Sequence, residues 1–173
     1  MNIYLFPTEL EAAPFRALRP TARVVISGVG LAATAATLAM LGREGSLVAS
    51  RVVLAGLAGA YDERIAVGDV VEVVEERCAE LPERFRRSYS VTPRTKLRHV
   101  GSNSVHLGAE GGEDAVIENM EGATLFAVAE ALGFEACEVR AISNRVGEPF
   151  ERWRTKEALE ALAHALIEID DGE

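Results

Sequence analysis

The order of apolar and polar residues along the chain switches repeatedly between the two-residue period of strands and the longer period of helices. Short apolar runs predict strands at 2–6, 23–27, 50–61, 68–76, 97–108 (with a break at Gly101) and 136–143. Helical spacing predicts helices at 8–18, 28–41, 120–133 and 155–169. This alternation predicts a single α/β domain over residues 1–173, with a largely parallel or mixed sheet.

Residues at the ends of these helices support the prediction. Thr8 is placed to cap the first helix, and Gly133 to close the third. The apolar stripe of the last helix consists of Leu159, Leu162, Ala163, Leu166 and Ile167. His164 lies off this stripe and is expected to face solvent. The polar segments 81–96 and 108–114 are predicted to be a surface loop and a turn.

The charge and hydropathy of the chain argue against nucleic-acid and membrane partners. The chain has 173 residues, 49% of them hydrophobic and 26% charged, and a formal net charge of −9. Because phosphate backbones repel such a charge, no nucleic-acid partner is expected. No apolar run reaches the roughly 18 residues of a membrane span, and the start lacks a secretory signal. We therefore expect a cytoplasmic protein without a membrane partner.

The cysteines and histidines give no sign of a metal site. Cys78 and Cys137 lie far apart, which favours buried free thiols over a disulfide or a metal pair. His99, His106 and His164 show no ligand spacing. We expect no metal and no cofactor.

Residues that directly follow a strand are candidates for the site, because ligands of such sheets bind at the carboxyl ends of the strands. The segments concerned are Thr8–Glu11, Ser27–Gly30, Gly56–Gly59, Ser102–His106, 117–121 and Ser143–Asn144.

Glycines mark two of these segments. Ser27 and Gly28 precede a helix, where a backbone can approach a ligand and the helix N-terminus favours anions or polar oxygens. Gly56 and Gly59 end another strand and allow the same close approach. Both segments are equally consistent with simple tight turns, so substrate binding by Ser27, Gly28 and Gly59 is one of two interpretations.

Three charged residues suggest chemistry when they are considered together. Glu11 and Glu121 lie at helix starts, where acids also occur on the surface because they stabilise the helix dipole. Arg140, however, lies inside an apolar strand, and burying its charge is costly unless it is paired. If both acids face Arg140, the three side chains form a polar cavity that can hold a water or a sugar hydroxyl.

Four motifs occur in the order SGVG, AGLAGAYDERIAVGDVV, ENMEGATLFAVAEALG and VRAISNRV. They resemble the nucleoside phosphorylase/nucleosidase family, which includes methylthioadenosine nucleosidase. The futalosine hydrolase branch is more similar, in its glycine turn, in ENMEG, and in RAISN followed by a tryptophan. The resemblance covers most of the chain and includes LEAAPF near its start. It implies a three-layer phosphorylase/hydrolase-like α/β fold, with a central mixed sheet flanked by helices, here in a shortened form.

The resemblance implies cleavage of an N-glycosidic bond. On this basis Glu11 activates the attacking water, and Arg140 holds that water and orients Glu11. Glu121 accepts hydrogen bonds from the ribose hydroxyls, Met120 packs under the sugar, and Asn119 borders the sugar site.

Asn144 is implied to face N7 of a purine. Adenine-specific relatives carry Asp there, which can protonate N7, whereas an amide can accept from N7–H and donate to a 6-oxo group at once. Asn144 therefore favours a 6-oxopurine nucleoside such as futalosine, whose base is hypoxanthine. Phosphorylases of the family carry an arginine where this chain has Leu54 and Ala55. Water is therefore expected as the nucleophile in place of phosphate.

The chain is shorter than the family pattern, without room for a hairpin after the first helix. Ser102–His106 is then expected to supply the base wall, and Phe150 and Trp153 are candidates either for stacking or for ordinary packing. The leading hypothesis is futalosine hydrolysis for menaquinone synthesis. The alternatives are a methylthioadenosine/S-adenosylhomocysteine nucleosidase and a catalytically silent nucleoside-binding homologue. The family also implies a homo-oligomer, often a dimer.

Overall fold

The computed structural model describes residues 1–108 and 115–171. The strands are β1 (Asn2–Phe6), β2 (Val24–Ile26), β3 (Arg51–Ala60), β4 (Val70–Cys78), β5 (Ser88–Ser90), β6 (Arg98–Ser104), β7 (Ile117–Asn119) and β8 (Glu135–Arg145). The helices are α1 (Glu9–Leu18), α2 (Leu31–Arg43), α3 (Gly122–Leu132) and α4 (Thr155–Asp171), with short 3-10 turns η1 (Glu83–Phe85) and η2 (Phe150–Arg152). This order confirms the predicted α/β class.

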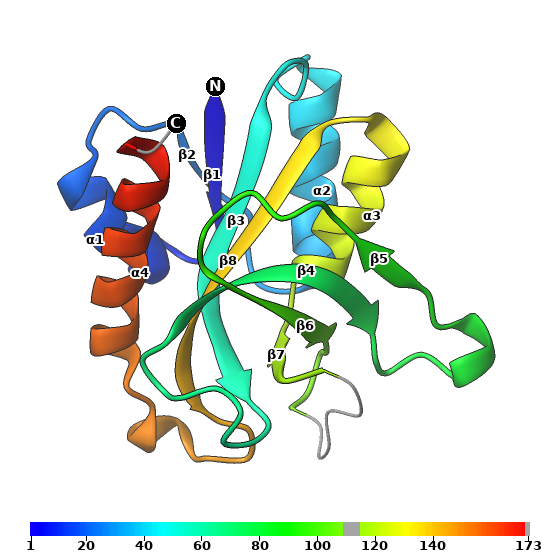
Figure 1. Cartoon of the computed structure of the whole chain (residues 1–173). Helices are drawn as coiled ribbons and strands as arrows, with labels where there is room; N and C mark the ends of the chain where they lie inside the picture. The colour runs from blue at the N-terminus through cyan, green and yellow to red at the C-terminus, as the bar shows by residue number, and fades with distance from the viewer. Residues whose placement is uncertain (109–114, 172–173) are drawn as a thin grey trace.

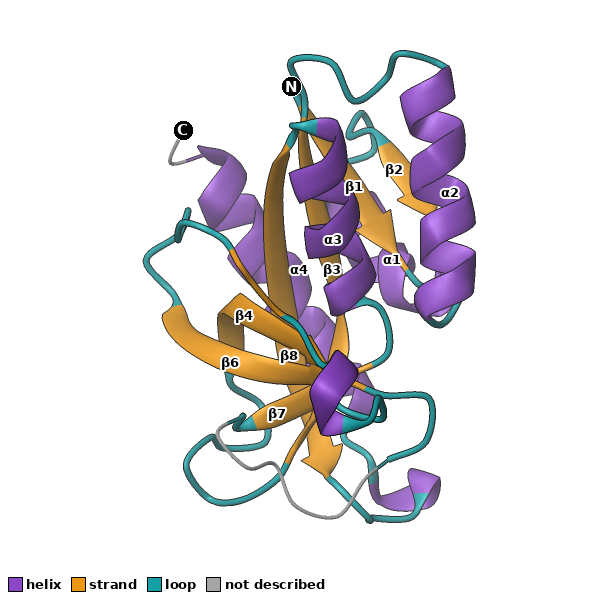
Figure 2. Ribbon diagram, turned by 90° about the vertical axis from the view of Figure 1, so that its right-hand side faces the viewer, coloured by secondary structure: helices purple, strands orange, loops and turns teal. Residues whose placement is uncertain are grey.

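One mixed sheet joins the strands, and part of it closes on itself. β2, β1 and β3 form a parallel edge, and β8 lies parallel to β3. β8 pairs antiparallel with β4, β4 parallel with β6, and β6 parallel with β7, which returns antiparallel to β3. The strands β3, β8, β4, β6 and β7 therefore form a closed ring in the lower half of Figures 1 and 2.

Helices cover the open part of the sheet on both faces. α1 and α4 pack together on one face, and α2 and α3 on the other (Figure 1). Successive residues of a strand point to opposite faces, so β1 contributes to two cores. Tyr4 and Phe6 pack with Phe15 of α1. Ile3 and Leu5 belong to the core beneath α2 and α3. The result is the predicted three-layer arrangement.

The predicted helix ends are confirmed by local contacts. The Thr8 hydroxyl accepts a hydrogen bond from the Glu11 N–H at 3.2 Å, so it caps α1. Gly133 closes α3 with a left-handed φ of 73°, a conformation that glycine adopts without strain. His164 is exposed on α4. The buried residues of the α4 stripe are Leu159, Leu162, Ala163 and Leu166.

Three local predictions were wrong. The predicted loop 81–96 contains η1 and β5, which pairs with β4 as an edge strand. β6 runs through Gly101 without a break; the irregularity lies in β4, where the pairing skips Val74. β7 was not predicted, because its three residues form a strand only where β3 and β6 both pair with them. The turn predicted at 108–114 lies, apart from its first residue, outside the described residues.

Within the described residues, no helix combines the length and apolarity that crossing a membrane requires. Cys78 and Cys137 are both free thiols; Cys137 is buried as predicted, whereas Cys78 is only half-buried. The described part of the chain contains no group of His, Cys, Asp or Glu residues suited to holding a metal ion.

Candidate active site

A cavity of about 570 Å³ opens where several strands end. It is bordered by the segment after β1, the end of β3, the segment after β6, the turn between β7 and α3, and the end of β8 with the segment that follows it. Its polar and charged lining residues are Thr8, Glu11, His106, Glu118, Asn119, Glu121, Ser143, Asn144, Glu148 and Thr155. These are the strand ends at which ligands of α/β sheets bind.

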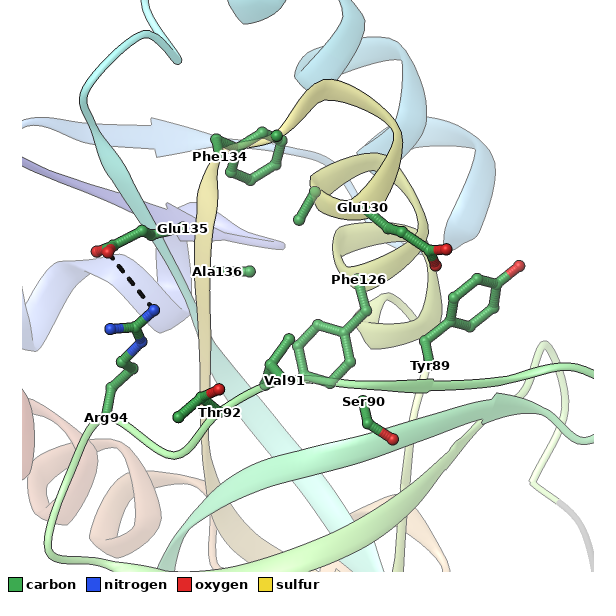
Figure 3. A pocket seen from close by; sticks show the side chains of 12 residues that line it. Tyr89, Ser90, Val91, Thr92, Arg94, Phe126, Glu130, Phe134, Glu135 and Ala136 are labelled. Carbon is green, nitrogen blue, oxygen red and sulfur yellow. Dashed lines mark ion pairs between the residues drawn. The ribbon is translucent and has the colours of Figure 1, made fainter.

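A smaller cavity of about 360 Å³ lies between β5 and α3 (Figure 3). Tyr89, Phe126 and Phe134 line it, and Arg94 pairs with Glu135 at its edge, at 3.5 Å. Its lining contains none of the predicted site residues. The candidate site is therefore the larger cavity.

Glu11 projects into this cavity from the first turn of α1. Its Oε2 accepts a hydrogen bond from the Thr8 hydroxyl at 2.7 Å, and its Oε1 accepts one from the Leu57 N–H at 3.0 Å. Gly56 leaves the space for this arrangement, because a Cβ on it would lie 2.9 Å from Glu11 Oε1 and 2.8 Å from Arg140 Nη1. The cap of α1 and the end of β3 thus hold the carboxylate beside Arg140.

Arg140 is fully buried in β8. Its Nε donates to Glu138 Oε1 at 2.8 Å, and its Nη2 donates to Glu121 Oε2 at 3.2 Å and to Asn119 Oδ1 at 2.9 Å. Burial alone lowers its pKa, but the charges of Glu138, Glu121 and Glu11 outweigh burial and raise the pKa. The buried cation is therefore paired with acids, as its position in an apolar strand required, and Glu138 is an additional partner.

Glu121 is held by two segments that are distant in the sequence. Its Oε1 accepts a hydrogen bond from the Gly30 N–H at 2.9 Å, and its Oε2 faces Arg140. Each carboxylate oxygen keeps a further lone pair for a ligand. Met120, half-buried, lines the cavity next to it. The turn before α3 therefore presents an ionic and an apolar group side by side.

The turn at Ser27–Gly30 is one of the two glycine segments for which the sequence left substrate binding and a simple tight turn both open. The buried Ser27 hydroxyl donates to the Gly28 carbonyl at 2.9 Å, and neither residue lines the cavity. Val29 does line it. Gly28 adopts a φ of 80°, which brings the backbone round so that the Gly30 N–H meets Glu121. The turn therefore positions a site residue and forms part of the wall.

Asn119 borders the cavity, but its amide is fully engaged by the protein. Its Nδ2 donates to Ser102 Oγ at 2.8 Å and to Glu76 Oε1. Its Oδ1 accepts from the N–H groups of Glu121 and Gly122, both at 2.8 Å. Asn119 therefore fixes the turn that carries Glu121, and it lines the cavity where the sugar site is predicted.

Asn144 reaches the cavity because β8 contains a bulge. The register between β3 and β8 pairs Ala58 with Ile142 and Gly59 with Asn144, so Ser143 is an extra residue. Since side chains alternate along a strand, one extra residue turns the following side chains to the other face. Gly59 also lines the cavity, and a Cβ on it would lie 3.3 Å from Asn144 Nδ2.

Chemistry fixes the orientation of the Asn144 amide. Its Nδ2 donates to the Arg145 carbonyl at 2.8 Å, and its Oδ1 accepts from the Ser143 hydroxyl at 2.7 Å. A backbone carbonyl only accepts hydrogen bonds, so the amide nitrogen must face Arg145. One N–H and one oxygen lone pair of Asn144 remain for a ligand.

Apolar and aromatic residues complete the wall. Phe150 and Trp153 both line the cavity, with their ring centroids 5.2 Å apart. Of the segment Ser102–His106, only Val105 and His106 line it, while the two serines are buried. The predicted base wall is thus only partly supplied by this segment.

Sequence reasoning missed two buried acids, Glu76 and Glu138, which lie behind Arg140. Glu138 could have been found, because it precedes Arg140 by two residues in a strand and therefore points to the same face. Glu76 belongs to an acidic run in β4 that gives no local sign of burial.

Comparison with known proteins identifies relatives of the whole chain. No protein-family model matches the chain. A futalosine hydrolase from Thermus thermophilus is 31% identical over 212 residues, which cover 96% of this chain and 93% of that protein. That alignment is longer than this chain, so the Thermus protein has insertions relative to it.

Solved structures match the fold over nearly its whole length. A 5′-methylthioadenosine/S-adenosylhomocysteine nucleosidase from Helicobacter pylori has a TM-score of 0.84 at 14% identity, covering 99% of this chain and 98% of that chain. Native futalosine hydrolase from Helicobacter pylori has a TM-score of 0.83 at 14% identity, with coverages of 99% and 97%.

The fold and the site together define an N-glycosyl hydrolase of the nucleosidase class. The structural matches establish the fold, and the identity with the Thermus protein establishes the relationship. The chain belongs to the nucleoside phosphorylase/nucleosidase family, the family of futalosine hydrolase.

Proposed function

We propose that this protein hydrolyses the N-glycosidic bond of futalosine and releases hypoxanthine and dehypoxanthine futalosine. The observation that carries the proposal is the amide of Asn144, which lines the cavity and keeps one N–H and one oxygen lone pair available for a ligand. The similarity to the Thermus futalosine hydrolase supports the same substrate.

Glu11 is the proposed general base. Its carboxylate takes a proton from a water as the water oxygen attacks C1′ of the ribose. The bond between C1′ and the purine nitrogen breaks at the same time, and its electron pair leaves with the base. The Thr8 and Leu57 hydrogen bonds hold the carboxylate in place before the substrate arrives.

Glu121 and Met120 are proposed to bind the ribose. The carboxylate of Glu121 accepts hydrogen bonds from the 2′ and 3′ hydroxyls, and Met120 packs under the ring. The sugar gains positive charge as the bond breaks, and nearby carboxylates stabilise that charge. Arg140 keeps Glu121 and Glu11 in one arrangement, because its charge interacts with both.

Asn144 is proposed to recognise the base. N7 of the hypoxanthine takes a proton from a second water as the bond breaks, so Asn144 Oδ1 accepts from the resulting N7–H while its Nδ2 donates to the 6-oxo group. Adenine carries an amino donor at that position, which would meet the amide donor unfavourably.

The charge of the cavity favours water over phosphate as the nucleophile. The described residues that line it include four glutamates and no arginine or lysine, and Leu54 and Ala55 are buried apolar residues of β3. A phosphate anion would meet repulsion without a cationic partner.

We also propose that the protein acts in the cytoplasm, in menaquinone synthesis, and as a homodimer. Leu10, Val29 and Phe150, at the cavity wall, are exposed by 64%, 52% and 67%, and a second copy that covered them would remove apolar surface from water. Sedimentation should then show twice the monomer mass; a monomer at all concentrations would contradict the dimer.

The test of substrate and reaction is a single assay with three nucleosides. The protein is incubated with futalosine, inosine or methylthioadenosine, with and without phosphate, and the free base is measured by chromatography. We expect hypoxanthine from futalosine at a rate that phosphate does not change. Adenine release from methylthioadenosine would contradict the role of Asn144, and nucleoside binding without any release would indicate a silent homologue.

A further inference from the structure

Two acids with no part in the proposed reaction lie inside the closed ring of strands. Glu76 of β4 and Glu138 of β8 are both 0% exposed. A Cβ on Gly122 would lie 2.4 Å from Glu76 Oε1 and 2.3 Å from Glu138 Oε2. The two carboxyl groups therefore converge on the space that the absent side chain of Gly122 leaves.

One of these oxygens lacks a partner. Among the described residues, Glu138 Oε2 makes no hydrogen bond, although it is fully buried. On the other side of the Gly122 gap lies Glu76 Oε1, another acceptor unless a proton lies between them. An orphaned acceptor beside a second carboxylate is costly in a dry interior, and a proton on one of them removes the cost.

The surrounding charges do not neutralise two ionised acids. Arg140 of β8 is the cation of the cluster, and it already faces Glu121 from the turn before α3. The other titratable neighbours include Tyr61, which follows β3, Cys78 of β4 and Cys137 of β8, and none of them is a cation. β6 contributes only the hydroxyls of its serines.

The acid pair is connected to the site through both of its members. Glu138 Oε1 accepts from Arg140 Nε at 2.8 Å. Glu76 Oε1 accepts from Asn119 Nδ2. The side-chain Oδ1 of Asn119 in turn accepts from the Glu121 N–H and from Arg140 Nη2. Movement of Glu138 would therefore reach Glu121, the proposed binding residue for the ribose, through Arg140. Movement of Glu76 would reach it through Asn119.

We propose that Glu76 and Glu138 share one proton across the gap at Gly122, and that this singly protonated pair is the positioning element that holds Arg140 and Asn119 in the arrangement needed for turnover. The proton lies on Glu138 Oε2 and is directed at Glu76 Oε1. Glu138 Oε1 remains an acceptor for Arg140.

The raised pKa values of the two acids support the same arrangement. Burial, with the charge of Glu138 second, raises the pKa of Glu76 from 4.5 to about 8. Burial also raises the pKa of Glu138, in spite of Arg140. Because the folded pKa values of both acids lie above the unfolded ones, the stability that the shared proton contributes is complete below the unfolded pKa, near 4.5, and is lost as pH rises through the folded pKa of the pair.

Glu138→Gln tests the proposal, since a glutamine reproduces the protonated acid. Its carbonyl accepts from Arg140 and its amide donates to Glu76, with no proton to lose. As pH rises from about 5 to about 8.5, the unfolding temperature of the unsubstituted protein should fall, and that of Glu138→Gln should fall less. The difference between the two decreases should be about 5 °C or more. Futalosine turnover by Glu138→Gln should stay within about threefold of that of the unsubstituted protein. We expect turnover of the unsubstituted protein to fall at alkaline pH, as the shared proton is lost, and turnover of the variant to stay constant there.

Two further variants separate positioning from folding. Glu138→Ala, which removes the acceptor for Arg140, should lower kcat at least about tenfold, and the glutamine variant should restore it. Glu75→Gln removes a carboxylate from the partly exposed neighbouring position and should keep the original pH profile.

Two outcomes would overturn the proposal. One is an unfolding curve for Glu138→Gln that follows pH as the unsubstituted protein does; the other is a folded Glu138→Gln protein without turnover. The turnover measurements rest on the proposed function, whereas the unfolding measurements need no substrate. If the protein were inactive on futalosine, the proposed substrate would be refuted, and the unfolding measurements would still test the shared proton.

Discussion

At the scale of single residues, two side chains set the reaction and its substrate. Glu11 is fixed by a cap hydroxyl and a strand N–H, and Asn144 by a neighbouring hydroxyl and a carbonyl. Both are therefore oriented before a ligand binds, and pre-orientation of this kind lowers the cost of reaching the transition state.

Glu11→Gln should abolish hydrolysis while leaving nucleoside binding nearly unchanged. An amide still accepts from Leu57 but cannot take a proton from water, so kcat should fall by about 10²- to 10⁴-fold. Stopped assays with futalosine give the rate, and calorimetry gives the affinity. Glu9→Gln, at an exposed carboxylate two residues away, is the control and should retain full activity. Full activity in Glu11→Gln would refute the role of Glu11.

Asn144→Asp should shift the preference from 6-oxo to 6-amino purines. A carboxyl group can protonate N7 of adenine, but it cannot donate to a 6-oxo group when ionised. The ratio of kcat/KM for methylthioadenosine to that for futalosine should rise by about tenfold or more. An unchanged ratio would remove the argument from the amide.

At the scale of elements, the strand ends decide where these side chains meet. β3 supplies Gly56 and Gly59 at two places where a Cβ would touch a site residue. β8 supplies Arg140 and, beyond its bulge at Ser143, Asn144. The pairing of β3 with β8 therefore fixes the positions of Arg140 and Asn144 relative to each other along the cavity wall.

Gly56→Ala tests that close approach. The added Cβ would lie under 3.0 Å from both Arg140 Nη1 and Glu11 Oε1, so one of these groups must shift. A displacement of about 1 Å can cost on the order of 10²-fold in rate, and we expect a loss of that size in kcat. Gly101→Ala, in β6, meets no atom within 4 Å and should remain as active as the unsubstituted protein. Equal rates for the two variants would contradict the model of the site.

At the scale of the whole molecule, the last helix ties the two ends of the chain together. α4 packs against α1 and β8, and Leu162 and Leu166 are buried in the core shared with Phe15. Residues from both ends of the sequence therefore stabilise the sheet whose strand ends form the cavity.

Leu162→Ala should destabilise the entire fold. Removing a fully buried leucine side chain costs about 2–5 kcal/mol in the free energy of unfolding, depending on how far the cavity collapses. Denaturant unfolding should show one transition at lower denaturant. Leu132→Ala, at a 56% exposed position at the end of α3, should change stability by less than about 1 kcal/mol. A stability loss in both variants of the same size would contradict the packing of α4.

Features that depend on near neighbours could be predicted from the order of the residues. They are the alternation of strands and helices, the caps at Thr8 and Gly133, and the requirement that Arg140 be paired, because hydrogen bonds within a few residues and the cost of burying a charge are local properties.

Contacts between groups that are distant in the sequence could not be predicted and are seen only in the folded chain. The Gly30 N–H on Glu121, the bulge that turns Asn144 into the cavity, the three-residue strand β7 and the acid pair behind Arg140 each depend on contacts between segments far apart in the chain. Such contacts follow from strand register and ring closure, which no local pattern of residues encodes.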